Sequence, residues 1–85
     1  MHIKHAYRIV SWNSTERNAI EYIDSKGKFT AEAENAEVYY SDAMVREDLV
    51  RYLQMYPNRW YMVERGTLTI LIEWDTLSRK EDQTI

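Results

Sequence analysis

Residues 41–57, with the sequence SDAMVREDLVRYLQMYP, are the stretch that decides the fold. The large apolar residues in it recur at spacings of four, three, one and three, which traces one helical face. They are Val45, Leu49, Tyr52, Leu53 and Tyr56. Ser41 or Asp42 is a suitable N-cap, and Pro57 keeps the residue before it out of the α conformation. The pattern predicts one main helix whose apolar face needs a second layer to cover it.

The segments before this helix have the alternation and the β-branched and aromatic residues that favour strands. We predict extended segments at residues 3–12, 19–24, 28–30 and 37–40. A tight turn at 24–27 joins the second and third of them, because Gly27 can take the positive φ that closes a hairpin. Residues 31–35 fit either one helical turn or an irregular crossing.

After the helix, residues 60–65 and 67–74 have the pattern of a hairpin that turns at Arg65-Gly66. Side chains of a strand alternate between two faces. The face that we expect to pack on the helix holds Tyr61, Val63, Leu68, Ile70, Ile72 and Trp74. The other face holds Trp60, Met62 and Leu71, which is more apolar surface than a solvated sheet face needs. We expect another element or a binding partner to cover that second face.

The fold class follows from these elements and from the composition. The chain has 85 residues, no Cys, two Gly and one Pro, so one domain of mostly regular structure, held by packing, is expected. We predict a single α+β domain over residues 1–74, with a small antiparallel sheet of four to five strands packed against one main helix. Residues 75–85 are charged and lack an apolar period, which predicts a flexible C-terminal tail.

No motif for catalysis or metal binding stands out in the sequence. His2 and His5 are three residues apart on a predicted strand, so they point to opposite faces and cannot easily share a metal ion. The carboxylates have no anchoring His, and the serines have no neighbouring base to activate them. We therefore expect no catalytic residue, no cofactor and no metal, which is the profile of a binding protein and not of an enzyme.

The order of several short segments resembles a known group of small proteins. Phe-Thr at 29–30, Ala36 and Tyr-Ser at 40–41 lead into the helix, and Pro-Asn-Arg-Trp-Tyr-Met-Val follows at 57–63. Over residues 19–64 this layout resembles short, largely uncharacterised proteins encoded by bacteriophages and prophages. The resemblance implies stoichiometric inhibition of a host defence such as CRISPR–Cas or restriction, and it carries no catalytic residues.

The resemblance and the aromatic content together predict a phage-type protein that binds and blocks a host protein, such as a component of a defence system. Such a protein works in the cytoplasm of the bacterial host, and no apolar run approaches the ~20 residues of a membrane span. Trp, Tyr and Arg are the usual anchors of protein interfaces. The predicted partner-binding residues are Trp60, Met62, Leu71, Tyr39, Tyr40 and Arg59.

Two other readings of the sequence stay open. Arginines that stand among aromatic residues suit single-stranded nucleic acid, although the formal charge of −3 and the acidic residues nearby oppose it. The residues concerned are Arg46, Arg51, Arg59 and Arg65 with Tyr56, Trp60 and Tyr61. Alternatively, the second sheet face pairs with itself across a two-fold axis, which makes the protein a homodimer.

Overall fold

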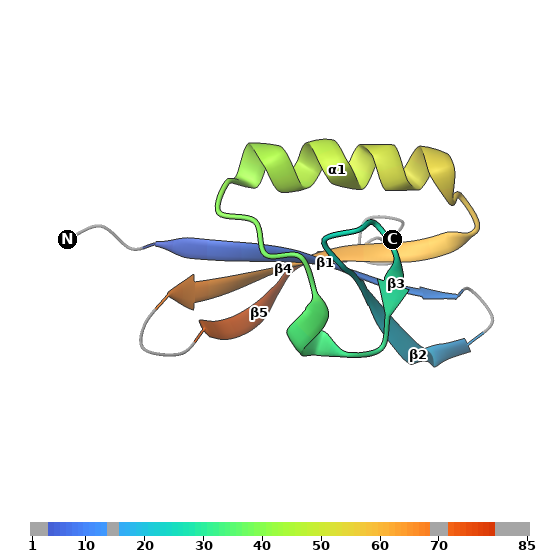
Figure 1. The fold of residues 1–85 in the computed structure, drawn as a ribbon, viewed down its shortest axis with the longest axis horizontal. Helices are drawn as coiled ribbons and strands as arrows, with labels where there is room; N and C mark the ends of the chain where they lie inside the picture. Colours follow the sequence, from blue (N-terminus) through green and yellow to red (C-terminus); the bar gives the residue numbers. More distant parts are fainter. Residues whose placement is uncertain (1–3, 14–15, 69–71, 80–85) are drawn as a thin grey trace.

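The computed structural model describes residues 4–13, 16–68 and 72–79. The chain folds into two layers, with one helix lying across one face of a five-stranded antiparallel sheet (Figure 1). The sheet order is β3-β2-β1-β4-β5. The elements are β1 (His5–Asn13), β2 (Glu16–Ile23), β3 (Phe29–Thr30), the 3-10 turn η1 (Ala33–Asn35), α1 (Asp42–Met55), β4 (Arg59–Leu68) and β5 (Ile72–Arg79). The predicted α+β class is confirmed.

Helix α1 begins and ends where its sequence signals lie. The Ser41 side chain accepts a hydrogen bond from the Met44 backbone N–H, which satisfies one of the unpaired donors of the first turn. At the other end the Tyr56 N–H donates to the Tyr52 carbonyl before Pro57 stops the helix. The helix predicted from the apolar spacing is confirmed.

The main core lies between α1 and the sheet. Its buried members come from β1, β2, β4, α1 and the segment that leads into α1. They are Tyr7, Ile9, Ile23, Tyr39, Val45, Tyr52, Tyr61 and Val63, and Phe29, Leu49 and Leu53 pack against them. Tyr61 and Val63 therefore face the helix as predicted.

The turn between β2 and β3 has the predicted glycine. Gly27 has a φ of 77°, a conformation that residues with a Cβ atom rarely adopt. The Asp24 carboxylate accepts hydrogen bonds from the backbone N–H groups of Lys28 at 2.9 Å and Lys26 at 2.8 Å. These two bonds, with that from Lys28 the stronger influence, lower the pKa of Asp24. The turn is therefore fixed both by its glycine and by an ionised carboxylate.

The turn predicted at Arg65-Gly66 is wrong. Both residues lie inside β4, where Gly66 is buried and pairs with Ala6 on one side and Trp74 on the other. Trp74 therefore lies on the sheet face opposite α1 and not on the predicted helix-covered face. Glycine is depleted in strands, but it is tolerated where a neighbouring aromatic ring can cover it. Ile70 and Leu71 lie outside the described residues.

The boundary predicted after residue 74 falls inside β5. Thr76 pairs with Glu64, and Arg79 pairs with Met62 across a register shift between Val63 and Glu64. Residues 75–79 are therefore part of the sheet and not of a tail. Their polar composition is typical of an edge strand, where charged residues discourage further pairing. Residues 80–85 lie outside the described part of the chain.

The described residues include no helix that is long and apolar enough to cross a membrane. The single α-helix among them has 14 residues.

Candidate binding face

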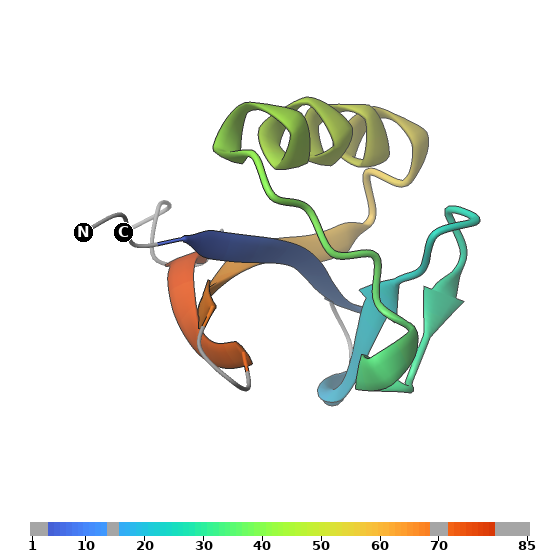
Figure 2. The ribbon, with the colours of Figure 1, turned by 60° about the vertical axis from the view of Figure 1, so that its left-hand side comes forward.

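The sheet face opposite α1 collects aromatic side chains, and we call it the aromatic face. In Figure 2, β2 and β5 bend away from α1 on either side of β1 and β4, so this face is concave. Strand alternation and register bring its members together, with Val10 opposite Met62 and Trp12 opposite Trp60. The aromatic face consists of Arg8, Val10, Trp12, Tyr22, Trp60, Met62, Glu64 and Trp74. Strand alternation from Tyr22 adds the exposed Ile20 at its edge.

The floor of the aromatic face is a second, smaller core. Val10, Trp12 and Met62 are buried, and half-buried Tyr22 and Trp60 pack against them. Three of these five side chains are aromatic, so much of the surface around the floor is rigid ring. Such partly exposed rings around a buried apolar centre resemble the arrangement of anchor residues at protein interfaces.

The floor contains a buried polar atom with no hydrogen-bond partner among the residues that the structure describes. The Trp12 indole Nε1 is buried, and it donates no hydrogen bond to any described residue. A buried donor without an acceptor costs about 1–3 kcal/mol. Such groups are rare in folded proteins, and they call for a specific explanation when they occur. The unpaired indole N–H therefore lowers the stability of the floor.

Arg8 lies at the centre of the aromatic face, next to Glu64. The Arg8 Nε donates to Glu64 Oε1 at 2.6 Å, and the two side chains are only 12% and 17% exposed. The guanidinium carbon lies 4.7 Å from the centre of the Tyr22 ring and 4.1 Å from that of Trp74. Arg8 is thus held by one carboxylate and by two rings that approach from β2 and β5, which gives cation–π contacts.

The contact between Trp74 and Arg8 depends on small residues in the strands between them. Trp74 belongs to β5 and Arg8 to β1, so the indole must reach across β4. In the row of Trp74, β4 carries Gly66 and β1 carries Ala6. A large side chain at either position would project from the same face and occupy the path of the ring.

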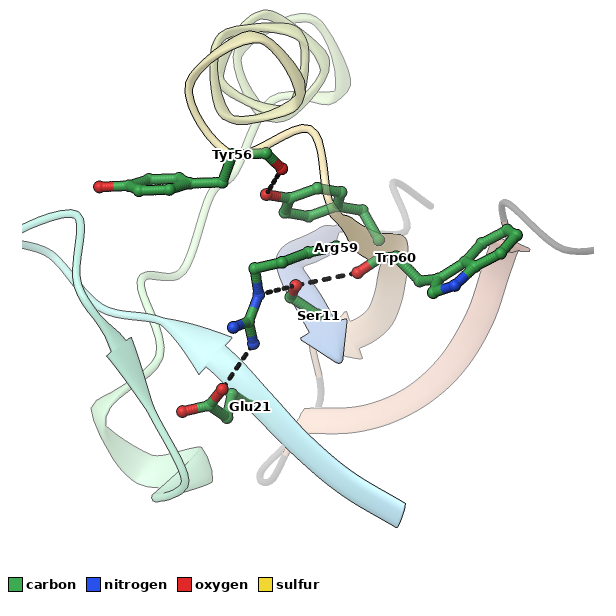
Figure 3. A network of polar contacts seen from close by, with 6 residues as sticks. Ser11, Glu21, Tyr56, Arg59 and Trp60 are labelled. Carbon is green, nitrogen blue, oxygen red and sulfur yellow. Dashed lines mark hydrogen bonds and ion pairs between the residues drawn. The ribbon is translucent and has the colours of Figure 1, made fainter. Parts of the chain in front are cut away.

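A polar network on the helix side fixes the end of β4 that carries Trp60 (Figure 3). Arg59 Nε donates to Ser11 Oγ at 2.9 Å, and the Arg59 NH2 group donates to Glu21 at 2.5 Å. Ser11 Oγ in turn donates to the Trp60 carbonyl at 2.9 Å. The Arg59 guanidinium also lies over the Phe29 ring, 3.9 Å from its centre. One arginine therefore joins β1, β2, β3 and β4.

The Tyr61 hydroxyl makes a separate set of contacts with the end of α1. It donates to the carbonyl of Tyr56 at 2.8 Å and lies 3.2 Å from that of Tyr52. Both carbonyls are at the C-terminal end of α1. The Tyr52 carbonyl also accepts from the Tyr56 N–H, whereas the Tyr56 carbonyl is among the last of the helix, which lack intrahelical donors. In Figure 3 the side chain of Trp60 points away from the contacts of Arg59 and Ser11. Neighbouring residues of β4 thus anchor the helix and contribute to the aromatic face.

The six residues predicted from the sequence do not form one surface. Trp60 and Met62 share the aromatic face as predicted, although Met62 is buried in its floor. Arg59 is on the other face, engaged in the network described above. Tyr40 is 68% exposed and lies in the segment that leads into α1, between the core residue Tyr39 and the N-cap Ser41. Leu71 lies outside the described residues.

Tyr39 is a core residue. Its backbone exchanges two hydrogen bonds of 2.7 Å with Tyr7, and its hydroxyl donates to Asp48 of α1 at 2.6 Å. Burial, and secondarily the Asp48 carboxylate, raise the pKa of the Tyr39 hydroxyl far above its ordinary value. Tyr39 therefore joins α1 to the sheet and is not available to a partner.

Several residues of the aromatic face are absent from the predicted set, among them Arg8, Trp12, Tyr22 and Trp74. The alternation of β1 already places Trp12 and Val10 on one face, and Arg8 has the same parity. No local signal brings Tyr22 and Trp74 to Arg8, because those contacts depend on the order and the curvature of the strands.

A second group of exposed apolar residues lies on the helix side. Met44, Val50 and Met55 of α1 are each more than half exposed. Arg46, Glu47 and Arg51 separate them on the helix surface, so they do not form one apolar stripe. Among the described residues, no three His, Cys, Asp or Glu side chains are grouped as a metal site would require.

Comparison of this chain with protein-family models, with curated proteins and with solved structures found no match.

Proposed function

We propose that this chain is a non-enzymatic binding protein whose aromatic face docks on a protein partner and blocks it. The observation that carries the proposal is the gathering of aromatic rings on the sheet face that α1 leaves uncovered. Tyr22 and Trp74 contact Arg8, and Trp60 packs on the floor farther along the same face. Trp, Tyr and Arg dominate the binding energy of most protein interfaces. Half-buried rings around a packed floor lose little conformational entropy when a partner covers them.

A protein partner suits the charges of this face better than a nucleic acid does. Arg8 is paired with Glu64, and on the other face Arg59 is paired with Glu21. Nucleic-acid binders instead use cations that are free to neutralise phosphates. The formal charge of −3 for the whole chain also repels a polyanion.

The kind of partner follows from the resemblance to phage and prophage proteins, which suggests a component of a host defence. The test is to express the protein in bacteria that carry a CRISPR–Cas or restriction system and to plate a phage which that system restricts. Restored plaque formation supports this form of the proposal. Unchanged restriction by every system tried removes the defence target and leaves docking on another protein to be tested.

A matched pair of variants tests which surface binds. Ile20, two residues before Tyr22 on β2, is 44% exposed, and Val50 on α1 is 53% exposed. Both are β-branched apolar residues, so Ile20→Glu and Val50→Glu place the same charge on opposite sides of the molecule. A buried, unpaired charge at an interface costs several kcal/mol, so Ile20→Glu should abolish capture of the partner. Val50→Glu should leave capture unchanged.

The readout is affinity capture from a bacterial lysate, with mass spectrometry of the captured protein and dissociation constants measured on the purified pair. Thermal melts of both variants establish that each is folded. The proposal is wrong if Val50→Glu removes the partner and Ile20→Glu does not. A Trp60→Ala variant should weaken the complex by about 2 kcal/mol or more, which is roughly 30-fold in affinity.

A further inference from the structure

We propose that the aromatic face recognises an acidic side chain of its protein partner, and that Arg8 is the anchor for that carboxylate. The inference rests on the proposed function and adds the chemistry of the partner. It is carried by the hydrogen bonds of the guanidinium, by its surroundings and by the charge that the face presents.

The Arg8 guanidinium has N–H donors that its hydrogen bond to Glu64 does not use. An arginine side chain carries five N–H donors, and the bond to Glu64 uses the one on Nε. The other four, on the two terminal nitrogens, have no acceptor among the residues that the structure describes. The side chain is 12% exposed, and its terminal nitrogens are not among the buried atoms that lack a partner, so they keep some contact with solvent.

The surroundings hold the guanidinium in place before a partner arrives. Tyr22 and Trp74 contact it, and the bond from Nε to Glu64 fixes its rotation. Two parallel N–H groups of a fixed arginine match the two oxygens of a carboxylate. The rings also leave only a small part of the side chain in contact with water, which strengthens a charged hydrogen bond there.

Glu64 gives this site its selectivity. The existing ion pair leaves Arg8 and Glu64 neutral together, so the site does not attract anions from a distance. A carboxylate gains only when it reaches the terminal nitrogens directly, which requires a partner shaped to the concave face. This favours an Asp or Glu presented on a protein surface over a free anion in solution.

The test uses a library of random twelve-residue peptides displayed on yeast and selected against the intact protein. The selected peptides should be enriched in Asp or Glu. Changing that Asp or Glu to Asn or Gln in the peptide should weaken binding about tenfold or more. The reason is that the charged hydrogen bonds between the peptide carboxylate and the Arg8 guanidinium are lost. Arg8→Lys keeps the charge but not the two-pronged geometry, and it should weaken the acidic peptides by a similar factor.

The outcomes separate the two proposals. Peptides that depend on Trp60 and on a carboxylate support the inference. Peptides that depend on Trp60 but bind equally well after the Asp→Asn change overturn it and leave the proposed function standing. If no selected peptide is weakened by Trp60→Ala or Ile20→Glu, both proposals are wrong. Because the Asp→Asn change is made in the peptide, the result does not depend on whether Arg8→Lys folds.

Discussion

Replacing Arg59 by Ala should destabilise the protein strongly, because this side chain joins four strands. The change removes a hydrogen bond to the fully buried Ser11, an ion pair with Glu21 and a contact with the Phe29 ring. A hydrogen bond to a charged group contributes about 1.5 kcal/mol, and the cation–π contact about 0.5–1 kcal/mol. The ion pair is partly exposed, since the Glu21 side chain is 34% accessible, so we assign it under 1 kcal/mol.

These contributions sum to about 2–3 kcal/mol. For a domain of this size that corresponds to a fall of about 10–20 °C in the melting temperature. Urea unfolding followed by far-ultraviolet circular dichroism measures the loss of free energy. The control is Arg46→Ala, which removes an i,i+4 pair with Asp42 whose side chains are half exposed. That variant should cost no more than about 0.5 kcal/mol.

The comparison decides between two roles for Arg59. If Arg59→Ala costs no more than Arg46→Ala, the network in Figure 3 does not stabilise the sheet, and the reasoning above is refuted. Arg59 would then be free to act as the partner anchor that the sequence suggests. A double-mutant cycle with Glu21→Ala isolates the ion pair, and its coupling energy should be well below the full effect of Arg59→Ala.

Three further predictions concern the helix end and the β2–β3 turn. Tyr61→Phe removes the hydroxyl donor at the end of α1, and chemical denaturation should show a loss of about 1 kcal/mol. Gly27→Ala places a Cβ atom at a positive φ and 3.2 Å from a tyrosine hydroxyl, so its melting temperature should fall, by an amount equivalent to about 1–2 kcal/mol. The lowered pKa of Asp24 means that its stabilisation is complete above pH ~4 and is lost as the pH falls through the folded-state value. Amide resonances of Lys26 and Lys28 should therefore shift in that acidic range in the wild type and stay constant in Asp24→Asn.

The parts of the fold that sequence reasoning predicted are those with local signals. Ser41 accepts from the first turn of α1, Pro57 follows its end, and Gly27 takes the positive φ that the turn needs. Each of these residues acts on backbone within four positions of itself, so its effect is visible in the sequence. Strand alternation likewise placed Trp60 and Met62 on the same face.

The errors concern residues whose role depends on distant neighbours. Gly66 fits a turn by composition, and only its pairing with Ala6 and Trp74 shows why a strand keeps it. Tyr39 and Arg59 are residue types that interfaces favour, but the structure gives both of them internal partners. Whether an aromatic or an arginine faces inward or outward is decided by tertiary packing, which the local sequence does not contain.

The gathering of Trp12, Trp60 and Trp74 on the aromatic face has an optical consequence. All the tryptophans of the chain belong to this one surface, while α1 has none. Intrinsic tryptophan emission of the folded protein therefore reports on the environment of the aromatic face alone. A molecule that covers that face will shift or quench the emission without any added label, and one that attaches along α1 will leave the spectrum unchanged.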